Sequence, residues 1–438
     1  MKHGTETIML AVLIVLCATI TLKTREDYFP EGADAAAQVA RIIGNDRTAG
    51  ERVLIIGSSQ DDAFVNETKD ALSAKGLEVV GTVQGGPREG RAELDRLKVA
   101  GKPLAYVACV KSVANWPFID NLATQFPEFA ATKVIAPKAT KRSPFLTKSN
   151  FMNILDRTAE VGIIAIGMTL IIITAGIDLS VGSVVALAAV ASAWTIKFLE
   201  RTMELPSAPV WAVLLACGAA VLVAGLVGAA NGSLITFVGV PPFIVTLSFM
   251  MIARGLAYII SGNQSISELP DSARWLGGKV ASIPVTVFLA IGLFAAGHFM
   301  MSRTPLGRYI YAVGGNREAA RLSGVPISKV LMFVYVVTGL LAGLVGLIVM
   351  SKLGAGKATY AEMMELNVIA AVVIGGTSLF GGEGRILGTL IGSLLISVIG
   401  NGMNLMGIES NGQKVVLGLV ILGAAIIDTV GKRRRGAG

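Results

Sequence analysis

The chain has 438 residues, of which 53% are hydrophobic and only 16% are charged, and its mean hydropathy is +0.67. This composition lies well outside the range of soluble domains and predicts a membrane protein. Apolar stretches of about 20 residues, the length with which an α-helix crosses a bilayer about 30 Å thick, recur along the chain. Alternating strands of the kind that build membrane barrels do not. We therefore expect an all-α polytopic protein of an inner membrane.

The first apolar run, IMLAVLIVLCATITL at 8–22, has two interpretations. It is short and a basic residue precedes it, as in a cleaved signal peptide. However, no small-x-small site follows Thr21, and Leu16 before Cys17 is too large for a lipoprotein cleavage box. We therefore expect an uncleaved first transmembrane helix within residues 1–24.

Residues 25–145 interrupt the apolar pattern with a polar segment in which β-rich and helical stretches alternate. Its β-rich stretches lie at 52–59, 77–84, 103–110 and 132–139. Strands that alternate with helices predict βαβ units and a parallel sheet. The segment resembles one lobe of a periplasmic sugar-binding protein, through this pattern and through RVLIIGSS before a helix. A lone lobe lacks the facing lobe that would enclose a ligand, so we favour a structural or docking role over a binding site.

After Asn150 the apolar runs resume, and with the first helix they predict about ten membrane helices. We place them near 159–177, 181–199, 209–230, 241–261, 284–302, 330–350, 366–379, 386–406 and 414–430. The segment 366–379 is short and rich in glycine. Together these helices form a predicted bundle over residues 146–431.

Basic residues in the short loops predict the orientation of the bundle. The loop 303–329 contains five basic residues and a single acid, Glu318, and the tail 432–438 is basic too. Both are therefore expected in the cytoplasm, with the tail able to contact anionic lipid. An even number of helices then places the amino terminus inside and the inserted segment on the periplasmic face. The net charge of +8 follows from this topology and requires no nucleic acid.

The stretch ITAGIDLSVGS at 173–183 places a carboxylate, Asp178, between two apolar helices. Asp178 or Ser180 can cap the following helix by accepting hydrogen bonds from its free N–H groups, and the positive end of that helix favours an acid. A carboxylate at membrane depth is costly, and Gly176 and Gly182 permit tight turns. We therefore expect a re-entrant corner inside the protein in addition to capping.

The longer stretch GMTLIIITAGIDLSVGSVVAL at 167–187 is similar to the membrane subunit of bacterial ATP-binding cassette (ABC) importers for monosaccharides, the ribose and xylose permease family. The residues that carry the resemblance are Gly167, Met168, Thr169, Thr174, Gly176, Asp178, Leu179, Ser180 and Gly182. It resumes at NGSLITFVGVPPFIVTLSFMMIARGLAYIISG and covers 144–431 and the first helix. This implies a bundle like that of type II ABC importers. Family members usually join their first two helices by a short outer loop, so the insert leaves open how substrate is delivered.

A second motif, GGNREAARLSGVP at 314–326, lies in the basic loop. Its E-A-A-x-x-x-G spacing resembles the loop that docks the ATPase of such importers. A short helix with small residues on one side can enter a partner's groove while charged side chains contact the rim. The alternative is a loop that merely forms a helix well. The candidate coupling residues are Gly315, Arg317, Glu318, Ala319, Ala320, Arg321 and Gly324.

Other chemistry has little support in the sequence. GAGKAT at 354–359 departs from a phosphate-binding loop, with Ser351 in place of the first glycine and Ala358 after the lysine. ATP hydrolysis is therefore expected on a separate chain. The histidines and cysteines fit no metal-ligand spacing, and no nucleophile motif stands out, so we expect no metal, no cofactor and no enzyme activity.

The path of the substrate is less defined. Polar residues that interrupt the helices can line a hydrophilic route or form hydrogen bonds between helices, and these are Asn231, Asn367, Asn401 and Asn404. We expect a homodimeric permease, with ABC ATPase subunits on the 303–329 loops and a periplasmic solute-binding protein outside.

Several alternatives remain open at this stage. The cargo can instead be a nucleoside or a branched-chain amino acid. An ion-coupled secondary transporter would need paired buried acids or a cation site along a broken helix. A membrane-anchored receptor that senses through residues 25–145 would need only one or two spans.

Overall fold

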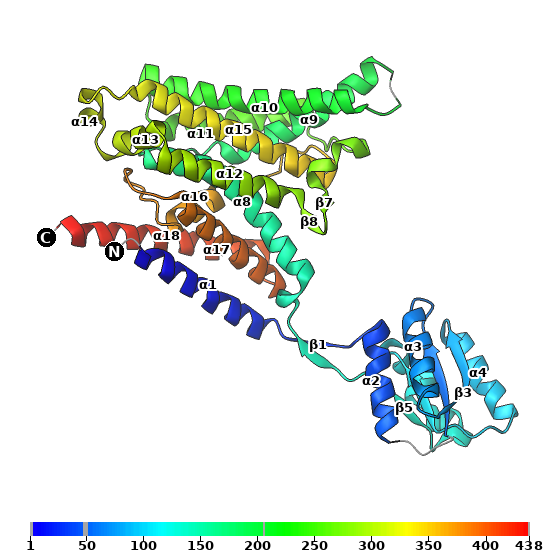
Figure 1. The fold of residues 1–438 in the computed structure, drawn as a ribbon. Coiled ribbons are helices and arrows are strands. Elements are labelled where there is room, and N and C mark those ends of the chain that lie inside the picture. The colour runs from blue at the N-terminus through cyan, green and yellow to red at the C-terminus, as the bar shows by residue number, and fades with distance from the viewer. Residues whose placement is uncertain (1–2, 47–50, 205, 437–438) are drawn as a thin grey trace. The chain divides into compact units, whose positions relative to one another are not determined.

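The computed structural model describes residues 3–46, 51–204 and 206–436 (Figure 1). The ends of the predicted first segment, residues 1–2, and of the basic tail, residues 437–438, lie outside the described residues. The chain divides into two compact units, residues 1–24 with 144–438 and residues 25–143. The first is a helical bundle and the second is an α/β unit.

The α/β unit is built on a four-stranded parallel sheet with the strand order β3-β2-β4-β5. The strands are β2 Arg52–Gly57, β3 Glu78–Gln84, β4 Tyr106–Cys109 and β5 Lys133–Ile135. The helices are α2 Gly32–Asn45, α3 Asp62–Ser73, α4 Pro87–Val99, α5 Lys111–Ala114, α6 Pro117–Asp120, α7 Leu122–Gln125 and the 3-10 turn η1 Pro127–Phe129. Val53 to Ile56 are all buried, as expected for a strand that is covered on both faces.

A short antiparallel ribbon joins the two ends of this unit. It pairs β1 Glu26–Tyr28 with β6 Thr140–Arg142, and Glu26 lies opposite Arg142. The Arg142 guanidinium carbon lies 5.0 Å from the centre of the Tyr28 ring. Because paired residues of an antiparallel ladder are neighbours, the chain enters and leaves the unit at adjacent points.

The bundle consists of helices that differ widely in length (Figure 1). They are α1 His3–Lys23, α8 Lys148–Ile173, α9 Val181–Thr202, α10 Val210–Ser233, α11 Pro242–Ser261, α12 Val285–Arg303, α13 Pro305–Gly315, α14 Arg317–Leu322, α15 Ile327–Leu353, α16 Met364–Ile374, α17 Ile386–Leu405 and α18 Ser410–Gly436. The short elements are η2 Pro144–Leu146, the π turn η3 Leu234–Val238, η4 Asp271–Ala273, η5 Trp275–Gly277, β7 Lys279–Val280 and β8 Ile283–Pro284.

Six helices among the described residues are long and apolar enough to span a membrane, namely α9, α10 with its π turn, α11, α12, α15 and α17. Shorter apolar stretches lie in α1, α16 and α18. Helix α8 has 26 residues, and its charged residues Lys148, Asp156, Arg157 and Glu160 lie in its first half. A multi-pass membrane protein is therefore supported, whereas the count of about ten stays a prediction.

Two of the helices whose predicted boundaries differ from the structure have a clear local cause. The helix expected at 159–177 begins at Lys148, where the Thr147 hydroxyl accepts a hydrogen bond from the Asn150 backbone N–H, and it ends at Ile173. The segment expected at 366–379 forms α16 only as far as Ile374, because two glycines follow and Gly376 adopts a φ of +83°.

Small residues bring several helices into backbone contact. A Cβ atom added at Gly339 or Gly343 of α15 would overlap α10 at Ala224, and one at Gly392 of α17 would overlap the Ala371 carbonyl of α16. Helices α10 and α15 lie side by side over most of their length (Figure 1). In lipid, where apolar burial drives association weakly, such close approach supplies the contacts that hold helices together.

Candidate coupling site

The corner between α8 and α9 is a tight, partly buried turn. The Thr174 hydroxyl donates to the Ile171 carbonyl (2.8 Å), and Ala175 adopts a φ of +61°, which is unusual for a residue with a side chain. A Cβ atom added at Gly176 would lie 2.8 Å from the Tyr335 hydroxyl of α15. The corner therefore has room for glycine alone at position 176, and α15 closes over it.

Asp178 is only 3% exposed and organises the start of α9. Its Oδ1 atom accepts hydrogen bonds from the Ser180 backbone N–H (2.8 Å) and from the Ser180 hydroxyl (2.6 Å). The Ser180 hydroxyl in turn accepts from Asn231 Nδ2 of α10 (3.0 Å). Within this described corner the Ser180 side chain makes no capping bond to α9, because it is engaged by Asp178 and Asn231. Asp178 thus fixes the turn just ahead of the helix.

The short helix α14 projects from the bundle between α13 and α15 (Figure 1). Asn316 begins it, with Oδ1 accepting from the Ala319 backbone N–H (3.0 Å), and Gly324 follows it with a φ of +78°. Glu318 and Arg321 form an exposed ion pair of 3.0 Å. Ala320 is the buried member of the predicted set, whereas the other members of that set, Gly315, Arg317, Glu318, Ala319, Arg321 and Gly324, are exposed.

Leu322 at the end of α14 is 80% exposed, which is unusual for a leucine next to charged residues. The sequence analysis did not single it out. The sequence does contain an indication of it: Leu322 is a large apolar residue in a short polar helix that begins after Asn316 and ends before Gly324. An exposed apolar side chain with a rim of arginines is the composition typical of the centre of a protein interface.

Three segments far apart in the chain meet directly behind α14. A Cβ atom at Gly314 of α13 would overlap the Ile173 carbonyl at the end of α8 and would lie 2.7 Å from the Gly382 nitrogen. The Gly382 backbone N–H, in the turn between α16 and α17, donates to the same Ile173 carbonyl (2.9 Å). The coupling loop, the α8 corner and the α16–α17 turn are thus in backbone contact.

A side chain strengthens this junction. The Tyr311 hydroxyl of α13 donates to the Gly384 carbonyl of the α16–α17 turn (2.7 Å). Burial raises the pKa of the Tyr311 phenol, so it remains a donor at neutral pH. The junction therefore links α13, next to α14, to both the corner and the turn after α16.

Comparison with known proteins identifies the bundle. Residues 150–425 match a family profile described as the permease component of a branched-chain amino acid transport system. The chain belongs to this permease family. The permease is 41% identical over 300 residues to the ribose import permease protein of Escherichia coli (strain K12), a match that covers 67% of this chain and 90% of that protein.

Two further relatives are similar over comparable lengths. The ribose import permease protein of Bacillus subtilis (strain 168) is 40% identical over 287 residues, covering 65% of this chain and 86% of the relative. The D-allose transport system permease protein of Escherichia coli (strain K12) is 36% identical over 285 residues, covering 65% and 84%. Membership makes the chain a transport subunit of an inner membrane rather than an enzyme. The family match begins at residue 150, so the α/β unit lies outside it.

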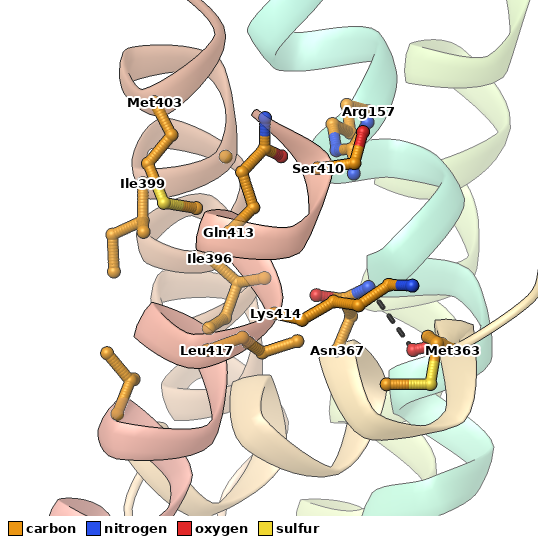
Figure 2. A pocket seen from close by; sticks show the side chains of 12 residues that line it. Arg157, Met363, Asn367, Ile396, Ile399, Met403, Ser410, Gln413, Lys414 and Leu417 are labelled. Atoms are coloured by element: carbon orange, nitrogen blue, oxygen red, sulfur yellow. Dashed lines mark hydrogen bonds between the residues drawn. The ribbon is translucent and has the colours of Figure 1, made fainter. Parts of the chain in front are cut away.

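The asparagines predicted to line a pathway have different surroundings in the permease. Asn231 is 1% exposed, and its Nδ2 donates a hydrogen bond to the Ser180 hydroxyl at the corner. Its Oδ1 has no hydrogen-bond partner among the described residues. Asn401 of α17 and Asn150 of α8 exchange two amide hydrogen bonds of 2.7 and 3.0 Å. Asn404 accepts from Gln413 Nε2 (2.7 Å). These contacts correspond to the alternative of bonds between helices, whereas Asn367 lines a cavity (Figure 2).

One partly buried cation was also missed. Arg254 of α11 donates from Nη1 to the Ala358 carbonyl and to the Tyr360 carbonyl (2.8 Å). These carbonyls belong to the non-helical stretch 354–363 before α16, whose backbone groups lack helical partners. The signal in the sequence was a single arginine within the apolar stretch of α11. It holds the broken segment in place inside the permease.

Proposed function

We propose that the chain is the membrane subunit of an ABC importer for a monosaccharide such as ribose or xylose. The observation that carries this is the 41% identity over 300 residues to a ribose import permease, together with the similarity to a D-allose permease. The family profile is described by branched-chain amino acid transport, so amino acids are the main alternative cargo, ahead of nucleosides.

The exposed helix α14 supports docking of a separate ATPase. Leu322 offers an apolar centre, while Arg317 and the Glu318–Arg321 pair supply polar rim contacts. Through the backbone contacts of Gly314 with Ile173 and Gly382, movement of a docked ATPase would displace the helices of the bundle. Closure of two ATPase subunits would then rock two permease copies between outward and inward states.

The remaining components follow from this assignment. The loop 303–329 and the tail 432–438 lie in the cytoplasm, with the tail against anionic lipid, and residues 25–143 lie in the periplasm. A periplasmic solute-binding protein delivers the sugar to a homodimer of the permease. The α/β unit, as a lone lobe, serves a structural or docking role in that delivery.

Docking is tested by substitutions on α14. Leu322→Asp and Glu318→Lys leave the fold intact, because both side chains are exposed, but are expected to abolish copurification of the ATPase and sugar uptake. Val99→Asp is the matched control, since Val99 is 88% exposed on the α/β unit. If the ATPase copurified with both α14 variants, the docking assignment would be wrong.

Cargo is tested by uptake into proteoliposomes that contain the permease, its ATPase and its binding protein. We expect ATP-dependent accumulation of labelled ribose, xylose or allose and none of leucine or adenosine. Accumulation of leucine or adenosine alone would replace the sugar assignment. Accumulation driven by an ion gradient without ATP would indicate a secondary transporter.

The role of the α/β unit is tested by removing it. Thr24 can be joined to Pro144 through a short linker, because the β1–β6 ribbon brings the two ends of the excised segment together. We expect the shortened permease to insert and to retain the ATPase, since α14 is unchanged, while uptake falls. Undiminished uptake would exclude an obligatory role in delivery.

A further inference from the structure

The bundle contains a cavity of about 120 Å³ between α8, α16, α17 and α18 (Figure 2). It lies toward the end of the bundle at which α8 begins, away from α14. Its polar lining comes from Arg157, Asn367, Ser410, Gln413 and Lys414. Two cationic side chains, Arg157 and Lys414, lie at this cavity, both are exposed, and neither belongs to the coupling site.

Arg157 of α8 lies against Gly400 of α17. A Cβ atom added at Gly400 would lie 3.7 Å from the Arg157 Nε atom and 3.9 Å from Nη2. The guanidinium therefore lies alongside the glycine, where a larger residue would occupy the space between the two helices. This places a planar, permanently charged donor group at the cavity wall.

Lys414 and the amino end of α18 supply positive charge from another wall. Helix α18 starts at Ser410, and the N–H groups of a first turn are unpaired within the helix and carry partial positive charge. Gln413 Nε2 donates to Asn404 Oδ1 (2.7 Å) and to the Ile408 carbonyl (2.8 Å), which fixes this turn against the end of α17. Figure 2 shows Lys414 extending across toward Asn367.

Carboxylates near the cavity do not offset this charge. Among the described residues that line it, none is an aspartate or a glutamate. Glu409, one residue before α18, is exposed and outside the lining. Glu365, on the first turn of α16, lies against Gly182 at the start of α9 instead. The site thus combines Arg157, Lys414 and a helix amino end without an acid.

The other walls are apolar. They are formed by Met363, Ile396, Ile399, Met403, Leu417 and Val420. A ligand that fits both parts has an anionic oxygen group at one end, and any apolar portion lies along these side chains. Arginine binds phosphate and carboxylate oxygens through paired N–H donors, which a neutral ligand does not require.

We propose that this cavity binds an oxyanion, a phosphate or carboxylate group, between Arg157, Lys414 and the amino end of α18. Asn367 is a further polar contact from α16. The same chemistry is supplied by the phosphate of an anionic phospholipid, whose chains would follow the apolar walls, or by a soluble anion. Because the cavity joins α16 to α8, α17 and α18, an occupant stabilises this side of the bundle.

The test is the thermal unfolding of the full-length permease in an uncharged maltoside detergent. The probes are phosphatidylglycerol, diacylglycerol with the same chains, inorganic phosphate, and chloride at matched ionic strength. We expect the unfolding midpoint to rise with phosphatidylglycerol but not diacylglycerol if the source is a lipid, or with phosphate but not chloride if it is a soluble anion. Because a ligand that binds only the folded state raises this midpoint, either result supports the site.

Variants assign the effect to the cavity. Arg157→Gln and Lys414→Gln should each weaken the apparent affinity for the active probe roughly tenfold or more, the loss expected for a charge-assisted hydrogen bond. Gly400→Leu keeps both charges but fills the cavity and should abolish the response. Lys148→Gln, an exposed position on the same α8, is the control and should respond as the unchanged protein does.

Two results would overturn the proposal. One is that neither phosphatidylglycerol nor phosphate stabilises the unchanged permease beyond diacylglycerol and chloride. The other is that the Arg157 and Lys414 variants respond as strongly as Lys148→Gln. Should a charge variant fail to fold, the response of the unchanged protein and of Gly400→Leu still decides the outcome.

Discussion

Replacing Gly314 by alanine probes the junction behind α14 with a single methyl group. The new Cβ atom would overlap the Ile173 carbonyl oxygen and lie 2.7 Å from the Gly382 nitrogen. Ordinary carbon contacts are about 3.5–4.0 Å, so α13 must move away from the Ile173 carbonyl by about 2 Å. The methyl group also wedges into the 2.9 Å hydrogen bond from the Gly382 N–H to the Ile173 carbonyl.

The expected loss of stability follows from these contacts. Overpacking a close contact costs about 1–3 kcal/mol, and the lost hydrogen bond adds about 1 kcal/mol, giving about 2–4 kcal/mol. Gly292→Ala in α12 is the matched control, because a Cβ atom there meets nothing within 4 Å. Its backbone needs no positive φ, so it should be neutral or slightly stabilising.

The assay compares ATP hydrolysis, uptake and thermal unfolding of the two variants in the assembled transporter. For Gly314→Ala we expect the ATPase to remain bound and active, while uptake per ATP hydrolysed falls by about tenfold, as displaced coupling contacts would produce. Uptake equal to that of Gly292→Ala at equal amounts of folded protein would refute transmission through this junction.

Three further changes test separate parts of the chain. Asp178→Ala leaves the Ser180 N–H and hydroxyl without their acceptor and should lower the free energy of unfolding by about 2–4 kcal/mol. Asp178→Asn keeps an oxygen acceptor and should lose less, so equal losses for the two variants would show that the charge itself matters. Burial raises the pKa of Cys109 to about 12, so, with the other two cysteines replaced, maleimide should label it only after unfolding. Because the pKa of this thiol is higher in the folded state, its contribution to stability is fully present below the unfolded-state pKa of about 9 and is lost as the pH rises toward 12. Fast labelling of the native protein would contradict the burial of Cys109. Asn401→Leu should cost about 1–2 kcal/mol by unpairing Asn150, and the double replacement with leucine should recover part of that loss.

The parts of the fold that depend on local patterns followed from the sequence. Long apolar runs mark α10 and α15, because each helix needs only its own residues to satisfy its backbone in lipid. The Asp178–Ser180 hydrogen bonds could also be predicted from the sequence, since their partners are two residues apart. By contrast, α8 ends at Ile173, just before Ala175, which adopts a left-handed conformation. No residue type at that position predicts this conformation.

The contacts that join distant segments could not be predicted from the sequence. Gly314 meets Ile173 and Gly382, and nothing near any one of them in the chain indicates the other two. Asn401 looked equally suited to a pathway or to a helix contact until its pairing with Asn150, 251 residues away, was seen. A polar residue in an apolar helix marks a place of interest, but its partner is fixed by packing.

The β1–β6 ribbon makes the junction at Glu26 and Arg142 a natural splice point. Because both chain directions pass through one pair of neighbouring strands, a whole module can be gained, lost or exchanged there with little change in the spacing of the helices on either side. The match of residues 150–425 to permeases then coexists with an additional module. The same junction would accept a reporter protein whose ends lie close together.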